Sequence, residues 1–293
     1  MPSPKDLRRR IKSVKNTAQI TRAMQMVAAS KMRRAQQAAL SGRPYAMLLN
    51  KVLGEVTSAT REFNHPLLEV REVKKKALIL VSSDKGLCGA LNTNLLREAS
   101  KTDKATTAYI AAGRKGSQFV ARTRRDLAAE FTYKDAPAFT EARAISKIAQ
   151  DMFLKGDVDQ VDILFTNFIS TLSQRPETQT FLPVGEIMGV DVAMDGEGGG
   201  SELAHGATEF LFEPGAETVF GALLPHYLNF KVYQILLEAK ASEHSARMVA
   251  MKSATDNAKQ LIKDLTIEYN KMRQASITNE LLEITTAQAA MGN

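Results

Sequence analysis

The chain of 293 residues has a formal net charge of +7 and is 44% hydrophobic, a composition typical of a soluble protein with ample length for a buried core. Its longest uncharged runs fall short of the roughly 18 to 20 apolar residues that a transmembrane helix needs, and its start lacks the apolar core of a signal peptide. The single cysteine, Cys88, excludes an internal disulfide and a multi-cysteine metal site, so we expect a reducing, cytoplasmic location.

The positive charge is concentrated at the start of the chain. Residues 5–61 contain thirteen Lys or Arg against two acidic residues, a net charge of +11, so the remainder sums to −4. A segment this basic favours an acidic partner. The candidates are nucleic acid, anionic lipid and an acidic protein surface.

A helix is predicted from the first few residues onward. Ser3 is placed to cap it, Pro4 suits the first helical position, and Asp6 complements the helix dipole. Apolar or small residues then alternate at spacings of four and three, the period of a coiled-coil seam. The positions are Leu7, Ile11, Val14, Ala18, Thr21, Gln25, Ala28, Met32, Ala35 and Ala39. This phase continues to Val56, so we predict a single helix to about residue 60, kinked or loosened at Gly42 and Pro44.

The middle of the chain alternates between strand and helix patterns, which predicts a small α/β layer with a largely parallel sheet. Expected strands cover residues 77–81, 107–112, 129–133 and 161–169, with residues 178–182 pairing to the last of these as a hairpin. Expected helices cover residues 92–100 and 141–154, with a short helix after the turn at 113–116. Residues 195–201 are predicted to form a surface loop and residues 210–212 an edge strand.

The last quarter of the chain predicts a very long helix. Residues 226–291 contain neither glycine nor proline, so no residue there forces a helix to stop, and such a helix is roughly 100 Å long. A second seam of period 3.5 follows this segment. Its positions are Leu237, Ala241, His244, Met248, Met251, Thr255, Ala258, Ile262, Leu265, Tyr269, Met272 and Ser276.

The two matching seams indicate how the chain is organised. We predict a long antiparallel coiled coil of the N- and C-terminal helices with a small α/β, Rossmann-like domain inserted between them. The expected parts are an N-terminal coiled-coil helix (residues 1–62), a central α/β domain (70–213) and a C-terminal coiled-coil helix (214–293). The alternative is that each helix packs separately on the central domain.

Patterns that carry chemistry are weak. The glycines at 86–89 stand at a strand end, where open sheets bind ligands, but they form neither a GxGxxG nor a Walker A loop. A tight turn is the preferred interpretation. The four histidines are scattered and no HExxH motif is present. We therefore predict no catalytic residue, no cofactor-binding residue and no metal ligand in this chain.

The basic N-terminal helix remains as a functional signal. Nucleic-acid binding usually combines such charge with aromatic side chains or a recognisable module, and no aromatic residue lies between Met1 and Pro44. Solvated charges and an acidic protein surface are the other options. A basic coiled-coil nucleic-acid-binding or adaptor protein is kept as the alternative function.

Four blocks of sequence resemble one family, the gamma subunits of F-type ATP synthases. They are residues 20–33 (ITRAMQMVAASKMR), 83–89 (SDKGLCG), 244–257 (HSARMVAMKSATDN) and 269–280 (YNKMRQASITNE). The resemblance spans nearly the whole chain, with the blocks in order. The main departure is the glycine-rich stretch at 195–201.

The resemblance implies the rotor shaft, or central stalk, of a proton-translocating ATP synthase. In this family the coiled coil runs up a ring of alternating alpha and beta subunits, and the α/β domain sits beside the epsilon subunit and on the membrane c-ring. One copy per complex, without a cofactor, couples proton-driven rotation to the catalytic sites and helps regulate ATPase activity. The ATP chemistry belongs to the surrounding subunits. The implied location is peripheral, at the cytoplasmic face of the inner membrane.

The resemblance also implies residues that contact the alpha/beta hexamer. They are Met24, Arg33, Arg34, Arg247, Arg273, Gln274, Thr278 and Glu280. Residues 284–290 (ITTAQAA) are uncharged and mostly small, as suits a tip that turns in an apolar sleeve. Because the C-terminal helix is the longer of the two, its last turns are expected to project alone into the ring.

Overall fold

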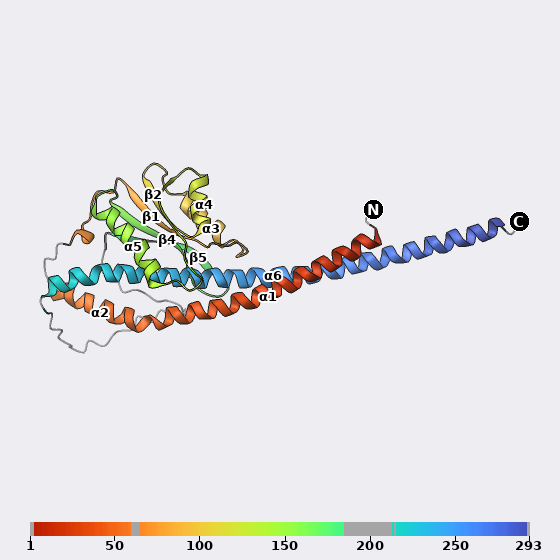
Figure 1. The fold of residues 1–293 in the computed structure, drawn as a ribbon, viewed down its shortest axis with the longest axis horizontal. Helices are drawn as coiled ribbons and strands as arrows, with labels where there is room; N and C mark the ends of the chain where they lie inside the picture. Colours follow the sequence, from red (N-terminus) through yellow and green to blue (C-terminus); the bar gives the residue numbers. More distant parts are fainter. Residues whose placement is uncertain (1–2, 60–64, 185–212, 214, 292–293) are drawn as a thin grey trace. The chain divides into compact units, whose positions relative to one another are not determined.

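A computed structural model describes residues 3–59, 65–184, 213 and 215–291 (Figure 1). The chain divides into two compact units. One joins Met1–Val27 to Met248–Asn293, and the other is Ala28–Arg247. The predicted loop at 195–201 and the predicted edge strand at 210–212 lie outside the described residues.

A five-stranded sheet forms the centre of the larger unit, in the order β3-β2-β1-β4-β5 (Figure 1). The strands are β1 (Lys76–Val81), β2 (Thr107–Ala112), β3 (Asp126–Phe131), β4 (Gln160–Phe168) and β5 (Gln174–Leu182). Strands β1 to β4 are parallel, and β5 runs antiparallel to β4. The predicted largely parallel sheet and its terminal hairpin are confirmed. The third strand was placed three residues too late, because Asp126 and Leu127 look like the end of a turn in sequence.

Helices cover both faces of this sheet, which explains why β1 reads as a continuous apolar run. Ile79 and Val81 face a core that contains residues of α5 (Phe139–Leu154) and of α6 (Ala216–Met291). Leu78 and Leu80 point the other way, into a core shared with α3 (Leu91–Ser100) and α4 (Arg114–Arg122). The alternation of side chains along a strand thus supplies both cores from one strand. The short 3-10 helix η1 (Pro66–Leu68) adds the buried Leu67 to the first core.

The N-terminal segment is two helices, so the single helix predicted to about residue 60 is wrong. α1 (Pro4–Ser41) and α2 (Arg43–Ala59) are separated at Gly42. Pro44 has no N–H to donate to the carbonyl of Leu40, and glycine is a weak helix former, so the interruption falls where the sequence is least helical. The apolar phase continues into α2, whose Ala46, Leu49 and Leu53 are buried in the core around the sheet.

The C-terminal helix lies within the part expected from residue 214 onward, and it extends the run of residues 226–291 toward the N-terminus. α6 starts at Ala216, ten residues before His226, and includes Pro225. A proline inside a helix removes one backbone hydrogen bond. The helix continues through it because Phe220, Leu224 and Leu228 are buried on both sides of Pro225 and hold the two turns against the core.

The smaller unit is an antiparallel pair made by the first part of α1 and the last part of α6 (Figure 1). The start of α1 has the predicted cap: the Ser3 Oγ accepts from the Asp6 N–H at 3.3 Å, and the Asp6 carboxylate accepts from the Ser3 N–H at 3.2 Å. Leu7, Thr21, Thr255 and Leu265 are buried at the predicted seam positions. The coiled-coil interpretation is therefore confirmed, and α6 continues past the start of α1 (Figure 1).

Candidate functional site

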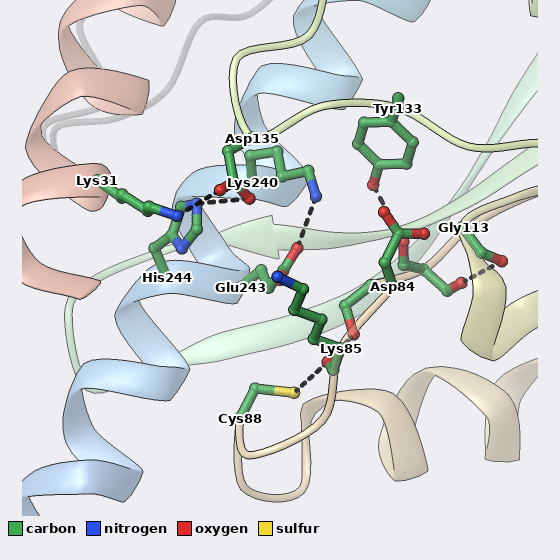
Figure 2. A network of polar contacts seen from close by, with 12 residues as sticks. Lys31, Asp84, Lys85, Cys88, Gly113, Tyr133, Asp135, Lys240, Glu243 and His244 are labelled. Atoms are coloured by element: carbon green, nitrogen blue, oxygen red, sulfur yellow. Dashed lines mark hydrogen bonds and ion pairs between the residues drawn. The ribbon is translucent and has the colours of Figure 1, made fainter. Parts of the chain in front are cut away.

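One turn of α6 carries a cluster of buried charged side chains (Figure 2). Lys240, Glu243 and Arg247 are spaced by three and four residues, so they lie on one face of the helix. The Lys240 Nζ lies 3.0 Å from the Glu243 Oε2, and these two side chains are 2% and 5% exposed. The Arg247 Nη2 lies 2.8 Å from the other carboxylate oxygen, Oε1. The Glu243 carboxylate thus bridges two cations inside the protein.

Arg247 also holds the loop that follows β1. Its Nη2 donates to the carbonyl of Gly86 at 3.2 Å and to that of Lys85 at 3.3 Å. In this loop Leu87 and Gly89 have φ angles of 63° and 60°, in the left-handed region that a leucine rarely adopts. The glycine-rich block at 86–89 is therefore a tight turn, as the sequence indicated, and two of its carbonyls are bonded to α6.

Tyr133, just after β3, closes the other side of the cluster. Its ring lies 4.4 Å below the Lys240 Nζ, and its hydroxyl donates to the carbonyl of Ser82 at 3.0 Å. Burial raises the pKa of the Tyr133 phenol well above its ordinary value, so the hydroxyl stays protonated and can donate. The stacked ring and the Glu243 carboxylate together compensate the buried lysine.

The loop after β1 packs closely on the turn before α4. Gly113 has a φ of 107°, and a Cβ at this position would lie 2.1 Å from the carbonyl oxygen of Ser82. Only glycine fits there. The Ser82 hydroxyl accepts from the Gly116 N–H at 2.7 Å, and the Asp84 carboxylate accepts from the Arg114 N–H at 3.0 Å.

Asp135 joins α1 to the same cluster. Its carboxylate accepts a hydrogen bond from Lys31, and this bond lowers the pKa of Asp135. The His244 Nε2 lies 3.8 Å from the Asp135 Oδ1, but burial lowers the pKa of His244 to about 4. The imidazole at this seam position is therefore neutral at pH 7.

The cluster joins several elements of the fold. Its charges compensate one another, and its donors and acceptors join the loop after β1, the segment after β3, α1 and α6. Within the described part of the chain, no group of three or more His, Cys, Asp or Glu side chains could hold a metal ion. Such a network fixes the relative positions of the elements that it joins.

The predicted partner-contact residues fall into different environments. On α1, Met24 is half-buried, whereas Arg33 and Arg34 are exposed. On α6, Arg247 is engaged within the chain, as described above. The others are exposed on the stretch of α6 beyond the paired region, and they are Arg273, Gln274, Thr278 and Glu280.

This end of α6 also exposes a row of large apolar side chains that we did not single out from the sequence. Ile277, Leu281 and Ile284 repeat at spacings of four and three and are 48%, 58% and 56% exposed. Such a row on a helix without a partner is typical of an interaction surface. The spacing was visible in the sequence, but the exposure depends on where α1 begins. We call residues 273–284 the α6 end.

Sequence reasoning also missed most of the charged cluster. Lys31, Tyr133 and Asp135 are far from residues 240–247 in sequence, so only the fold brings them together. The available signal was the placement of Lys240, Glu243 and Arg247 at helical spacing.

Comparison with known proteins matches these features to one family. The family described as ATP synthase matches residues 3–291. The ATP synthase gamma chain of Opitutus terrae is 49% identical over 292 residues, which cover 99% of both chains. The present chain belongs to the ATP synthase gamma chain family. The gamma chain of Methylacidiphilum infernorum is 45% identical over 297 residues, covering the whole of both chains.

Solved chains from ATP synthase rotors and central stalks share the fold. A chain of the Euglena gracilis mitochondrial ATP synthase rotor has a TM-score of 0.68 at 19% identity, covering 94% of this chain and 98% of that one. A chain of the Tetrahymena thermophila mitochondrial ATP synthase central stalk and c-ring has a TM-score of 0.60 at 25% identity, covering 80% and 99%. The resemblance noted in the sequence blocks is confirmed, and the nucleic-acid-binding or adaptor alternative finds no support in these matches.

Proposed function

We propose that this gamma chain is the rotor shaft of a proton-translocating F-type ATP synthase. The observation that carries the proposal is the α6 end, where the helix, unpaired among the described residues, presents apolar and charged side chains together. A shaft inside a ring needs such a surface, because it acts on its neighbours only through direct contacts.

The proposed partners are the alpha and beta subunits of the catalytic hexamer, the epsilon subunit and the membrane c-ring, with one copy of the chain per complex. Support comes from the solved relatives, whose assemblies are described as a central stalk with c-ring and as OSCP, F1 and c-ring. Met24, Arg33, Arg34, Arg247, Arg273, Gln274, Thr278 and Glu280 are the proposed contacts with the hexamer. The peripheral location at the cytoplasmic face of the inner membrane belongs to the same proposal. No helix in the described part of the chain is long and apolar enough to span a membrane.

In this proposal the chain itself is not catalytic. A shaft drives the catalytic sites through different conformations by contacting each state differently, since a rod with equal affinity for every state would shift no equilibrium. The exposed Arg273 and Glu280 and the apolar row provide contacts that change as the shaft turns. They are also a route by which the chain helps regulate ATPase activity.

We assign a role to each of the three parts of the chain expected from the sequence. Residues 1–62 and 214–293 form the shaft, and residues 70–213 form the domain at its foot. This division is supported by the strands of the described residues, which lie between Lys76 and Leu182.

A rotation experiment tests the proposal. The chain is co-expressed with alpha and beta subunits, with Cys88 replaced by serine and a cysteine placed at Leu172, which is 82% exposed, to attach a bead. We expect a complex in which ATP drives rotation in one direction. Failure of the unmodified chain to assemble with the hexamer, or a complex that hydrolyses ATP without rotating the bead, would overturn the proposal.

A further inference from the structure

We infer that Glu243 is a positioning residue, which orients Arg247 so that the loop after β1 is fastened to α6. The inference rests on the proposed function and deepens it, because it identifies the contact by which the α/β layer is attached to α6, the shaft helix. The loop in question is residues 84–89, which we call the β1 loop. Figure 2 shows Glu243 and Lys240 on α6 facing the part of this loop that carries Lys85 and Cys88.

The carboxylate of Glu243 is placed to act on both neighbouring cations. Its Oε2 forms an ion pair with the Lys240 Nζ at 3.0 Å, and its Oε1 forms one with the Arg247 Nη2 at 2.8 Å. A guanidinium presents its donors in a rigid planar fork, so fixing one edge of it fixes the direction of the others. Nη2 is held by Glu243 and also lies within hydrogen-bonding distance of the carbonyls of Lys85 and Gly86, and the Nε of the same guanidinium donates to the Gly86 carbonyl at 3.4 Å.

The backbone of the β1 loop needs such a restraint. Leu87 has a positive φ and an exposed side chain, so neither its own conformational preference nor burial holds it in place. Strained residues of this kind persist only where the surrounding contacts over-determine them. The carbonyls on the two residues before Leu87 are those that Arg247 binds.

A second contact holds the opposite side of the same turn of α6. The Ser245 hydroxyl donates to the carbonyl of Thr171 at 2.8 Å, in the loop between β4 and β5. Ser245 and Arg247 are two residues apart, and therefore about 200° apart around the helix. α6 is thus held from two sides by the loops that follow β1 and β4.

These two loops lie at a particular place in the sheet. β1 and β4 are neighbours in the strand order, whereas β2 and β3 lie on the other side of β1. Open α/β sheets bind their ligands where the strand order reverses in this way, outside the carboxyl ends of the strands. In this chain, Arg247 of α6 contacts the β1 loop at that place. The edge of the sheet that binds a small molecule in other open α/β folds therefore binds a helix here.

The burial of the cluster gives it a further property. Buried ion pairs add little net stability, but removing one partner leaves an uncompensated charge at high cost. A rotation of α6 by one residue relative to the sheet would separate Lys240 from Tyr133 and Arg247 from the β1 loop. The cluster therefore resists slippage of the helix within the α/β layer, as torque transmission requires.

Cys88 provides a built-in reporter. It is the only cysteine in the chain, it lies in the β1 loop, and it is 2% exposed. Its sulfur accepts from the Asn92 side chain at 3.2 Å. Because a buried thiol reacts only when its surroundings open, the rate at which N-ethylmaleimide alkylates the purified full-length chain measures opening of the β1 loop.

The main variant is a double substitution, Lys240→Met and Glu243→Gln. Both residues are replaced so that no buried lysine is left without a neighbouring anion. We expect the alkylation rate of Cys88 to rise about tenfold, as the loss of one charge-assisted contact allows. Arg247→Gln should raise it by a similar factor, and combining it with the double variant should add little. Glu243→Asp keeps the charge but shortens the side chain, so we expect an intermediate rise in the alkylation rate of Cys88. This variant replaces the double variant if the latter fails to fold.

Two controls separate positioning from general destabilisation. Glu268→Gln changes the same charge at an exposed position of α6, and Leu53→Ala weakens the core at a buried position of α2. Neither should raise the Cys88 rate as the Glu243 variants do. Equal rates in wild type and the Glu243 variants would overturn the inference, as would an equal rise in Leu53→Ala at matched thermal stability.

The assembled complex supplies the second measurement. Folded Glu243 variants should assemble with the hexamer but synthesise less ATP per proton translocated, with hydrolysis retained. If the wild-type chain assembles and couples while the variants match it in both Cys88 rate and coupling, the inference fails and the proposed function stands. If the wild-type chain itself does not assemble, the proposed function fails.

Discussion

The hydroxyl oxygens of Thr21 and Thr255 lie 2.7 Å apart in the buried seam between α1 and α6. Both side chains are less than one tenth exposed, and each is surrounded along its helix by apolar or small seam residues. A polar pair at one position of a coiled coil favours one register, because any other alignment leaves the two hydroxyls with only the carbonyls of Ala18 and Met251 on their own helices, to which they also bond. An antiparallel pairing through this contact places Leu7 near Tyr269, so the pair sets where the unpaired end of α6 begins.

A double-mutant cycle tests this pair. We expect Thr21→Val and Thr255→Val each to destabilise the chain, because each leaves the other hydroxyl without its partner. The double variant should cost less than the sum, with a coupling energy of about 1 kcal/mol. Urea denaturation followed by circular dichroism measures the four free energies, and strict additivity would contradict the role in register.

The α6 end should be needed for coupling but not for folding. Arg273→Ala with Gln274→Ala removes two exposed side chains, so the stability of the chain should change by no more than about 0.5 kcal/mol. Proton-driven ATP synthesis by the reconstituted complex should decrease several-fold. Lys271→Ala, which is also exposed but is not a proposed contact, is the matched control. Unchanged synthesis in the double variant would refute the assignment.

Two buried groups of α6 should give opposite pH dependences of stability. Burial raises the pKa of Glu238 to about 7 from 4.5, with the Glu177 carboxylate of β5 also raising it and the Phe168 N–H of β4 lowering it. The folded chain therefore holds a proton that unfolding releases between about pH 4.5 and 7, and stability falls as the pH rises through this window. Glu238→Gln should stabilise the chain at pH 8 by up to ~3 kcal/mol.

His244 gives the opposite pH dependence of stability. Its pKa is lowered from 6.5 to about 4 by burial, with Arg247 and Lys240 lowering it further and Glu243 and Asp135 opposing them. Unfolding takes up a proton between about pH 4 and 6.5, so stability falls as the pH decreases through this window. Melting temperatures of Glu238→Gln should therefore drop on acidification from pH 7 to 5, whereas those of His244→Asn should rise. Identical pH profiles for the two variants would contradict both assignments.

The isolated chain should not hydrolyse ATP. The charged groups of the cluster around Glu243 compensate one another, and the proposed function places the chemistry in the surrounding subunits. A coupled-enzyme assay of the purified chain should show no turnover above that of buffer, while the same preparation added to alpha and beta subunits should produce ATPase activity. Measurable turnover by the chain alone, surviving further purification, would contradict a purely mechanical role.

Local patterns predicted much of the fold because local physics controls them. The seam positions from Leu7 to Ala39 and from Leu237 to Ser276 follow from helical periodicity, which depends only on spacing along the chain. The strand from Lys76 to Val81 follows from a run of apolar residues that two helical layers must cover. At Pro225 tertiary contacts outweigh local preference, because burial of Phe220 and Leu228 carries α6 through the proline. At Gly42 and Pro44 local preference prevails instead, and α1 is separated from α2 although the apolar phase continues.

The candidate site divides in the same way. Periodicity and the family blocks placed Arg273, Gln274, Thr278 and Glu280 on a helix, but their exposure depends on where α1 begins opposite α6, which is a matter of register. The cluster around Glu243 could not be read from the sequence, because Lys31, Tyr133 and Asp135 join it across separations of about a hundred residues or more. Spacing along a helix predicts which side chains share a face, whereas folding decides what that face meets and whether its charges are compensated.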